Sequence, residues 1–279
     1  MSTIEVMPAR LTDEEAHDLR RAIACLEGAS FAQRLTDAIG RPISALSRGV
    51  PLPARRIVIH ASERALRAAL KLALRTIDMR RAPNPAHRAH NRAHKFAAAA
   101  SGAVGGAFGL AALPVELPLS TTILLRSIAE IAREEGEDLS APQAALACLE
   151  VFALGGKEEE EALFESGYFA VRAALAKSVS DSARFVASQG LGAQAAPAVV
   201  RLISQIAARF GVIVSEKLAA QAAPVLGAIG GAAVNAAFAE HFQTLARGHF
   251  IVRRLERTHG PNLVAFEYQR LKGERAAAA

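Results

Sequence analysis

The chain lacks the residues that build secreted domains. Its 279 residues include no Trp, two Tyr and two cysteines, Cys25 and Cys148. Two thiols are too few for a disulfide framework, and each lies in an apolar helical pattern where a free thiol behaves as a small hydrophobe. Residues 1–18 also lack the apolar core of a signal peptide. These features predict a protein of the reducing cytoplasm.

The common catalytic motifs are also missing. The sequence has no Gly-x-Ser-x-Gly elbow, His-Glu-x-x-His, Gly-x-Gly-x-x-Gly or Walker-type loop. Gly155-Gly156-Lys157-Glu158 has neither the spacing nor the hydroxyl residue of a phosphate loop. We therefore predict no cofactor, no metal and a non-enzymatic role, with an enzyme as the alternative.

The hydrophobic content of 51% is rich in alanine, and strand-like runs of Val, Ile or Thr are few. This composition predicts an all-α fold, a multi-helix bundle organised around two long Ala/Gly-rich helices. A turn from Arg80 to Pro85 suggests a boundary. We expect a basic helical N-terminal region at 1–82, a helical domain at 83–275 and a disordered tail at 276–279.

Local signals place the helices. Thr12 and Glu15 form a capping box for a helix to Leu26. Pro51 and Pro53 open a helix to about Asp78, and its predicted apolar side consists of Ile57, Ala61, Ala65, Leu66, Ala69 and Leu72. Further helices are expected at 30–48, from Pro118 until Gly136, from a cap at Ser140 and Gln143 to Gly155, and at 168–186, 195–210, 240–257 and 262–272.

Positive charge gathers at the two ends. The net charge is +8 over residues 1–95, −6 over 96–246 and +4 over 247–279. Aromatic residues interleaved with the cations, which base stacking needs, are absent from the N-terminal third. We expect an anionic membrane surface or lipid as partner, at the inner face of the cytoplasmic membrane, with a protein partner left open and no nucleic acid. The predicted contact residues are Arg80, Arg81, Arg88, Arg92 and Lys95.

Two nearly identical hexapeptides begin at Gly102 and Gly227, inside the uncharged stretches 96–115 and 218–239. The first stretch has the length of a membrane span, but its small residues make insertion marginal. At 100° per residue the glycines of each copy share one helical face, which favours close helix packing. The glycines assigned to this packing are Gly102, Gly105, Gly106, Gly109, Gly227, Gly230 and Gly231.

Several polar residues are candidates for binding. Glu116 is interpreted first as a surface residue at a helix break, and otherwise as a buried acid paired with Arg126 or Arg172. Arg253 and Glu256 suit an i, i+3 surface pair. The alternative is a polar pocket in which His249 joins them under a groove of small residues, to hold a headgroup or an anionic substrate. Asn235, near the end of the second Gly-faced helix, is a further binding candidate. His87, His90 and His94 share a helical face, but the flanking cations favour a solvated basic surface over a metal site.

The order of short motifs resembles the EcsC protein family, named for a protein encoded beside a bacterial ABC transporter. The motifs are His94-Lys95, Ser101-Gly102-Ala103, Gly105-Gly106, Gly109-Leu110, Glu116-Leu117-Pro118, Arg126, Tyr168-Phe169, Arg172, Ala174-Leu175, Pro224, Gly227, Gly230, Asn235, His249-Phe250, Arg253, Leu255-Glu256, Gly260 and Tyr268. The resemblance covers about residues 94–268. It implies a helical bacterial protein linked by genetic context to transport, secretion or membrane processes, and it carries over no catalytic residue.

The function that we expect is peripheral membrane association without catalysis, in a transport, secretion or envelope-related process. The alternative is an enzyme or carrier that binds a hydrophobic or lipid-like ligand between the Gly-faced helices.

Overall fold

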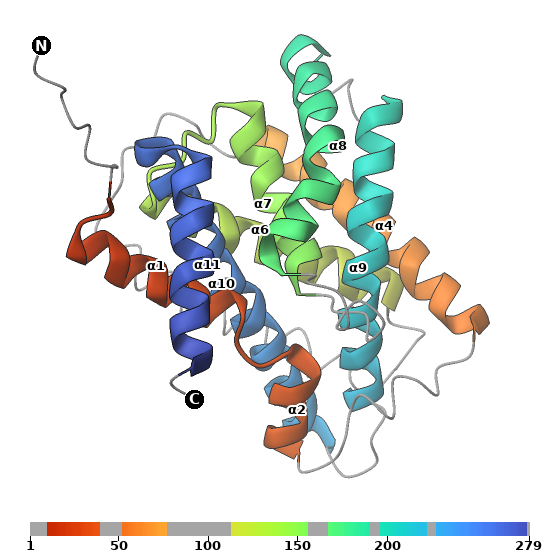
Figure 1. Cartoon of the computed structure of the whole chain (residues 1–279). Helices are drawn as coiled ribbons and strands as arrows, with labels where there is room; N and C mark the ends of the chain where they lie inside the picture. The colour runs from red at the N-terminus through yellow and green to blue at the C-terminus, as the bar shows by residue number, and fades with distance from the viewer. Residues whose placement is uncertain are drawn as a thin grey trace, which may run out of the picture.

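The computed structural model describes residues 10–39, 52–76, 113–155, 167–189, 196–221 and 227–277. This part of the chain is helical and contains no strand, which confirms the all-α bundle (Figure 1). The helices are α1 Asp13–Leu26, α2 Phe31–Ile39, α4 Leu52–Thr76, α6 Leu113–Glu134, α7 Pro142–Leu154, α8 Tyr168–Gln189, α9 Pro197–Gln221, α10 Gly227–His259 and α11 Pro261–Ala277.

The short helix α7 occupies the centre of the bundle. All ten residues from Ala144 to Ala153 are buried, because α4, α6, α8, α9 and α10 pack around this helix. Phe152 of α7 lies at the middle of an aromatic cluster, 5.0 Å from Phe210 of α9 and 5.2 Å from Phe242 of α10 between ring centroids. A helix that is apolar on every side has to be a core helix in a globular protein.

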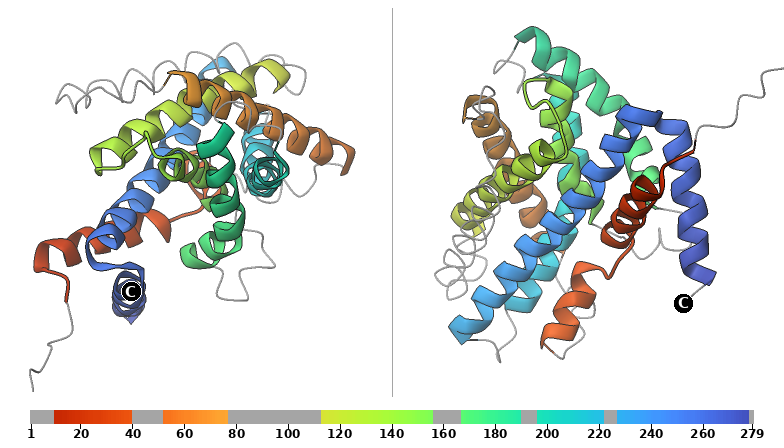
Figure 2. Two further views of the ribbon diagram at one scale, coloured as in Figure 1. Left: turned by 90° about the horizontal axis from the view of Figure 1, so that it is seen from above. Right: turned by 90° about the vertical axis from the view of Figure 1, so that its left-hand side faces the viewer.

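The long helix α10 connects the outer layers of the bundle. It contacts α1, α2, α6, α7, α9 and α11. Figure 2 shows it running obliquely across the molecule with α1 and α2 beside it. Its length of 33 residues corresponds to about 50 Å, so side chains along it reach widely separated neighbours.

The described N-terminal helices share the common core. Leu19 of α1, Phe31 of α2 and Leu66 of α4 belong to the same cluster of buried side chains as Phe152. The boundary predicted at residue 82 lies outside the described residues. At the other end, α11 continues to Ala277, beyond the predicted start of a disordered tail at residue 276.

Some predicted boundaries are confirmed and others are wrong. Thr12 caps α1 with the expected capping box to Glu15, and α7 ends at Leu154 with Gly155 as its C-cap. However, α6 begins at Leu113 and contains Pro118 inside the helix, where the proline lacks the N–H that would donate to the carbonyl four residues earlier. The predicted cap at Ser140 is also wrong: Ala141 precedes α7, Pro142 opens it, and the Ser140 hydroxyl donates to Asp138.

The uncharged stretch 218–239 includes the end of α9 at Gln221 and the start of α10 at Gly227, and residues 222–226 lie outside the described part of the chain. A further correction concerns one apolar residue of α4. Ala65, Leu66 and Ala69 are buried as predicted, but Ile57 is 57% exposed and its neighbour Val58 is 1% exposed, so the prediction is wrong at Ile57. The neighbours α6 and α9 determine which side is covered.

The predicted contact between the two glycine faces stays a prediction, because Gly102, Gly105, Gly106 and Gly109 lie outside the described residues. In the second copy Gly227 and Gly230 fall in the first turn of α10, and Gly231 is buried. Within the described part, a very close helix approach occurs instead at Gly248 of α10. A Cβ atom there would lie 2.7 Å from Leu26 Cγ and 2.9 Å from the Ala22 carbonyl oxygen of α1.

Candidate functional site

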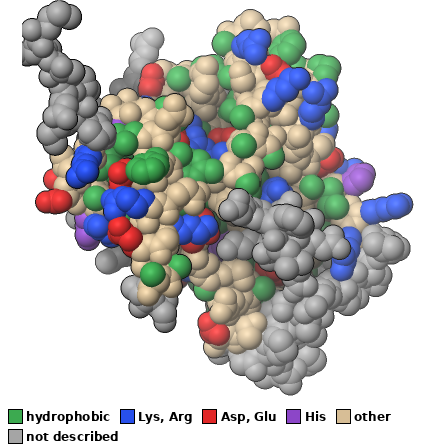
Figure 3. All heavy atoms as spheres, in the orientation of Figure 1, with side chains coloured by type: hydrophobic (Ala, Val, Ile, Leu, Met, Phe, Trp, Pro, Cys, Tyr) green, Lys and Arg blue, Asp and Glu red, His purple; other side chains and the backbone are tan. Residues whose placement is uncertain are grey.

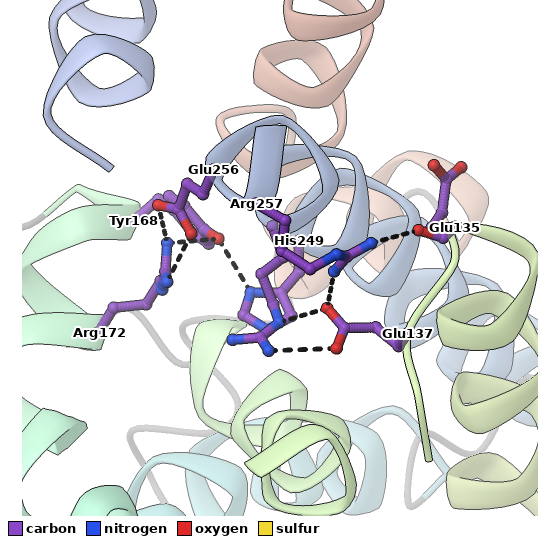
Figure 4. A network of polar contacts seen from close by, with 8 residues as sticks. Glu135, Glu137, Tyr168, Arg172, His249, Glu256 and Arg257 are labelled. Atoms are coloured by element: carbon purple, nitrogen blue, oxygen red, sulfur yellow. Dashed lines mark hydrogen bonds and ion pairs between the residues drawn. The ribbon is translucent and has the colours of Figure 1, made fainter. Parts of the chain in front are cut away.

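Four of the seven predicted binding residues meet in one polar network between α8 and α10 (Figure 4). His249, Arg253 and Glu256 follow one another at i, i+4 and i+7 on α10, so they project from one face. Tyr168 and Arg172 lie one turn apart at the start of α8 and point toward that face. The network is therefore built by the packing of two helices that are far apart in the sequence.

Arg172 and Glu256 form a bidentate ion pair. The guanidinium Nη1 and Nη2 donate to the two carboxylate oxygens at 2.7 and 2.9 Å, and Nη1 also donates to the Tyr168 hydroxyl at 3.3 Å. The same guanidinium lies 5.3 Å from the Tyr168 ring centroid. Burial acts to lower the pKa of Arg172, but Tyr168, Glu256 and Glu150 together raise it above its ordinary value, so the cation persists.

A second carboxylate, Glu137, accepts hydrogen bonds from two arginines of α10. Arg253 Nε and Nη2 donate to it at 2.8 and 3.2 Å, and Arg257 donates to it as well. Glu137 follows Gly136, whose φ of 78° turns the chain after α6 in a conformation that favours glycine. The predicted Arg253–Glu256 surface pair is therefore wrong, since each residue binds a partner on another segment.

The network continues to α1 through Arg254. This side chain lies 2.9 Å from Glu135 and donates to Asp18 at 2.6 Å. Ion pairs thus connect α8 to α10, α10 to the loop after α6, and α10 to α1. The arrangement clamps four segments of the bundle together.

His249 is the neutral centre of the network. Its Nδ1 lies 2.9 Å from the Tyr168 hydroxyl, and its fully buried Nε2 has no hydrogen-bond partner in the described part of the chain. Burial lowers the pKa of His249 well below its ordinary value, and the positive charges of Arg172 and Arg253 lower it further. The imidazole therefore stays uncharged at neutral pH.

Glu150 of α7 is close enough to Arg172 and Arg253 to interact with their charges, but the acids that pair with these arginines are Glu256 and Glu137. Burial raises the pKa of Glu150 from 4.5 to about 7, while Arg172 and Arg253 act to lower it. The native protein therefore holds a proton on this carboxyl between about pH 4.5 and 7, where the unfolded chain has released it. Since the native state binds more protons there, stability falls as pH rises through this window.

We expect Glu150→Gln to remove that pH dependence. Between pH 5 and pH 8, the free energy of unfolding of the wild type should fall by about 2–3 kcal/mol more than that of the variant. Urea unfolding at the two pH values measures the difference. Equal pH dependence in both proteins would contradict it. Glu216, whose pKa burial also raises to about 7, is unchanged in both proteins and cancels in the comparison.

The remaining predicted residues lie elsewhere. Glu116 on α6 pairs with Lys217 of α9 at 2.8 Å, and their side chains are 10% and 4% exposed, so the surface interpretation is wrong. The partner is also neither Arg126, which is exposed on α6, nor Arg172. Lys217 Nζ lies 4.9 Å from the Phe238 ring centroid, and burial lowers the pKa of Lys217 despite Glu116.

Asn235 is buried on α10 but lies fourteen residues, about 21 Å, before His249. It is therefore not part of the network. The predicted membrane contacts from Arg80 to Lys95 and the histidines at 87, 90 and 94 fall outside the described residues. In the part that is described, no group of three His, Cys, Asp or Glu side chains is arranged to hold a metal.

Sequence reasoning missed Glu137, Glu150, Tyr168 and Lys217. Glu150 had a readable signal, because it is the one charged residue in the apolar run from Ala144 to Ala153. A lone carboxyl in a core helix has to be protonated or face cations. Glu137 and Lys217 gave no comparable signal, because the partner of each is about a hundred residues away in the sequence.

One described helix, α9, is long and apolar enough to cross a bilayer by length and composition. Its apolar window has a mean hydropathy of 1.5, and half of that window is buried inside the bundle. A core helix of a soluble bundle meets the same criterion.

The fold and the site define an all-α bundle whose helices are joined by partly buried arginine–glutamate pairs. The family model described as the EcsC protein family matches residues 11–255, and the chain belongs to that family. The match extends the resemblance found from short motifs, which began near residue 94, so that it includes α1, α2 and α4. No curated protein and no solved structure matches the chain.

Proposed function

We propose that this EcsC-family protein is a non-enzymatic, peripheral membrane protein that works at an anionic membrane surface, in a transport, secretion or envelope-related process on the cytoplasmic side. The observation that carries the proposal is the separation of charge. The N-terminal third of the sequence holds the excess of cations. Many of them lie on α4, and most of the Arg and Lys side chains of that helix are exposed.

The contacts within the polar network support a structural role for the predicted binding residues that it contains. Arg172 and Arg253 direct their guanidinium groups at Glu256 and Glu137. A ligand with a carboxylate or phosphate would have to displace these two glutamates, because each already accepts hydrogen bonds from its arginine in a well-aligned ion pair. The network therefore explains how the bundle is held together without requiring a reaction.

Vesicle flotation tests the proposal. The full chain is expected to float with phosphatidylcholine vesicles that contain 30% phosphatidylserine, and to stay in the soluble fraction with phosphatidylcholine alone. Raising the salt concentration should release it, because surface charges are screened within about 8–10 Å near physiological ionic strength. A chain that ignores both kinds of vesicle at low salt would contradict the proposal.

A second candidate function is the carriage of a small ligand. The buried His249 Nε2 without a hydrogen-bond partner in the described region favours it, because such atoms are rare in native proteins. Native mass spectrometry of protein purified from cells tests it. A co-purified molecule whose loss follows His249→Phe would support ligand carriage, and a bare chain mass would count against it.

A further inference from the structure

Helix α4 has two different faces. Its buried face consists of Val58, Ser62, Ala65, Leu66, Ala69 and Leu70, which pack in the core formed with α6 and α9. The apolar side of this helix is therefore already occupied by protein. Any partner of α4 must bind its opposite, exposed side.

That exposed side is a strip of basic residues. Five residues at i, i+4, i+8, i+11 and i+15 lie within about 80° of one another around the helix, and all of them are exposed: Arg56, His60, Arg64, Arg67 and Lys71. We call these five residues the basic strip. It is about 22 Å long. Figure 3 shows Lys, Arg and His side chains projecting beside α4 at the right-hand edge.

The charge of the strip is weakly compensated. Glu63, the one acid of α4, lies 4.0 Å from Arg67 and accepts a hydrogen bond from Ser204 of α9 at 2.7 Å, so it is turned toward the bundle. An exposed ion pair at this distance contributes little. Ile57 is exposed at the margin of the strip and adds one apolar side chain.

The chemistry of the strip favours a lipid surface over nucleic acid. The strip carries no Phe, Tyr or Trp side chain on which a base could stack. Its cations form a straight row on a rigid helix, and the neighbouring apolar residue is aliphatic. A planar layer of anionic headgroups meets every cation of such a row at once, and long Arg and Lys side chains hold their charges at headgroup depth.

We propose that the basic strip of α4 is the surface that binds anionic lipid headgroups, with the helix lying on the bilayer and not inserting into it. This inference rests on the proposed function and names the contact. Because the apolar face of α4 stays in the core, binding is electrostatic and depends strongly on salt. Each Lys or Arg close to an anionic bilayer strengthens partitioning by about fivefold.

The test compares two full-length variants of equal net charge. The strip variant carries Arg56→Gln, Arg64→Gln, Arg67→Gln and Lys71→Gln. The control variant carries Arg20→Gln, Lys177→Gln, Arg184→Gln and Arg275→Gln, which remove four exposed cations from α1, α8 and α11. Circular dichroism spectra and melting temperatures should match the wild type in both, because every substituted side chain is exposed.

Binding to vesicles with 30% phosphatidylserine at low salt should fall on the order of several hundredfold in the strip variant. The control variant should stay within about fivefold of the wild type, the effect of a single cation at the surface. A third variant, Arg56→Lys, Arg64→Lys and Arg67→Lys, keeps the charges and should keep binding.

Other outcomes overturn the inference in distinguishable ways. If the strip variant binds vesicles as the wild type does, α4 is not the contact, although the proposed function survives. If both variants lose binding equally, net charge and not the strip is responsible. If the wild type itself binds no vesicle, the proposed function fails too. If it prefers an RNA duplex to vesicles at the same salt concentration and the strip variant loses that binding, the lipid assignment is wrong.

Discussion

Replacing Arg172 by alanine is expected to lower the free energy of unfolding by about 3 kcal/mol. The substitution leaves the Glu256 carboxylate, whose side chain is 13% exposed, without its bidentate partner. It also removes a donor from the Tyr168 hydroxyl and a cation from the face of two aromatic rings. The cost arises mainly because a desolvated charge is left unpaired. Urea unfolding followed by circular dichroism measures it.

A double-mutant cycle separates the pair from its surroundings. Glu256→Ala should cost a similar amount, and the double variant should lose less than the sum of the two single changes by about 1–3 kcal/mol. Arg172→Lys keeps the charge but loses the planar fork, so we expect it to restore only part of the stability. Arg126→Ala is the matched control, because that arginine is exposed on α6, and its effect should stay within about 0.5 kcal/mol. Additive single effects would contradict the assignment of Arg172 and Glu256 as a coupled pair.

Replacing Gly248 by alanine is expected to destabilise the protein by about 2–3 kcal/mol, although alanine is the better helix former. The new Cβ would lie 2.7 Å from Leu26 Cγ, and 2.9 Å from both the Ala22 carbonyl oxygen and Cys25 Cβ. Two of these three atoms belong to the backbone or to a Cβ, so α1 would have to move away from α10. Such a shift would also strain the ion pair between Arg254 and Asp18.

Gly273→Ala provides the control for this experiment. Gly273 lies in α11, and an added Cβ would meet no atom within 4 Å. The same chemical change should therefore stabilise the protein by about 0.5–1 kcal/mol, because it reduces the backbone entropy of the unfolded chain. Opposite signs at the two glycines are the expected result of thermal or urea unfolding. A stabilising Gly248→Ala would show that α1 and α10 do not approach as closely as described.

The residue pattern predicted the candidate site better than it predicted the contacts within it. His249, Arg253 and Glu256 follow at helical spacing, so their common face could be read from the sequence, whereas Arg172 was offered as a donor to Glu116 and not to Glu256. Which acid binds which arginine could not be read. Glu256 and Glu137 are both chemically suitable for Arg253, and only the chain turn at Gly136 places Glu137 within 2.8 Å.

Glu116 illustrates the same limit for burial. Between two prolines a lone carboxylate looks like a residue at a helix break, because proline usually ends a helix. In the structure both prolines lie near the start of α6, and the acid is one turn inside it. Its partner Lys217 lies on the later helix α9, 101 residues away in the sequence, and no local sequence pattern predicts that pairing.

The sequence by itself determined that this protein is an all-α bundle of the EcsC type, where its capped first helix begins and which residues are cationic. These properties depend on local propensity and on spacing along one helix, and both are written in the order of residues. Only the tertiary structure decided that α7 forms the centre, that Gly248 marks a close helix approach, and which face of α4 remains outside. Those outcomes depend on which helices pack together. Contacts between distant segments determine which side of each helix is buried, and the sequence alone does not specify those contacts.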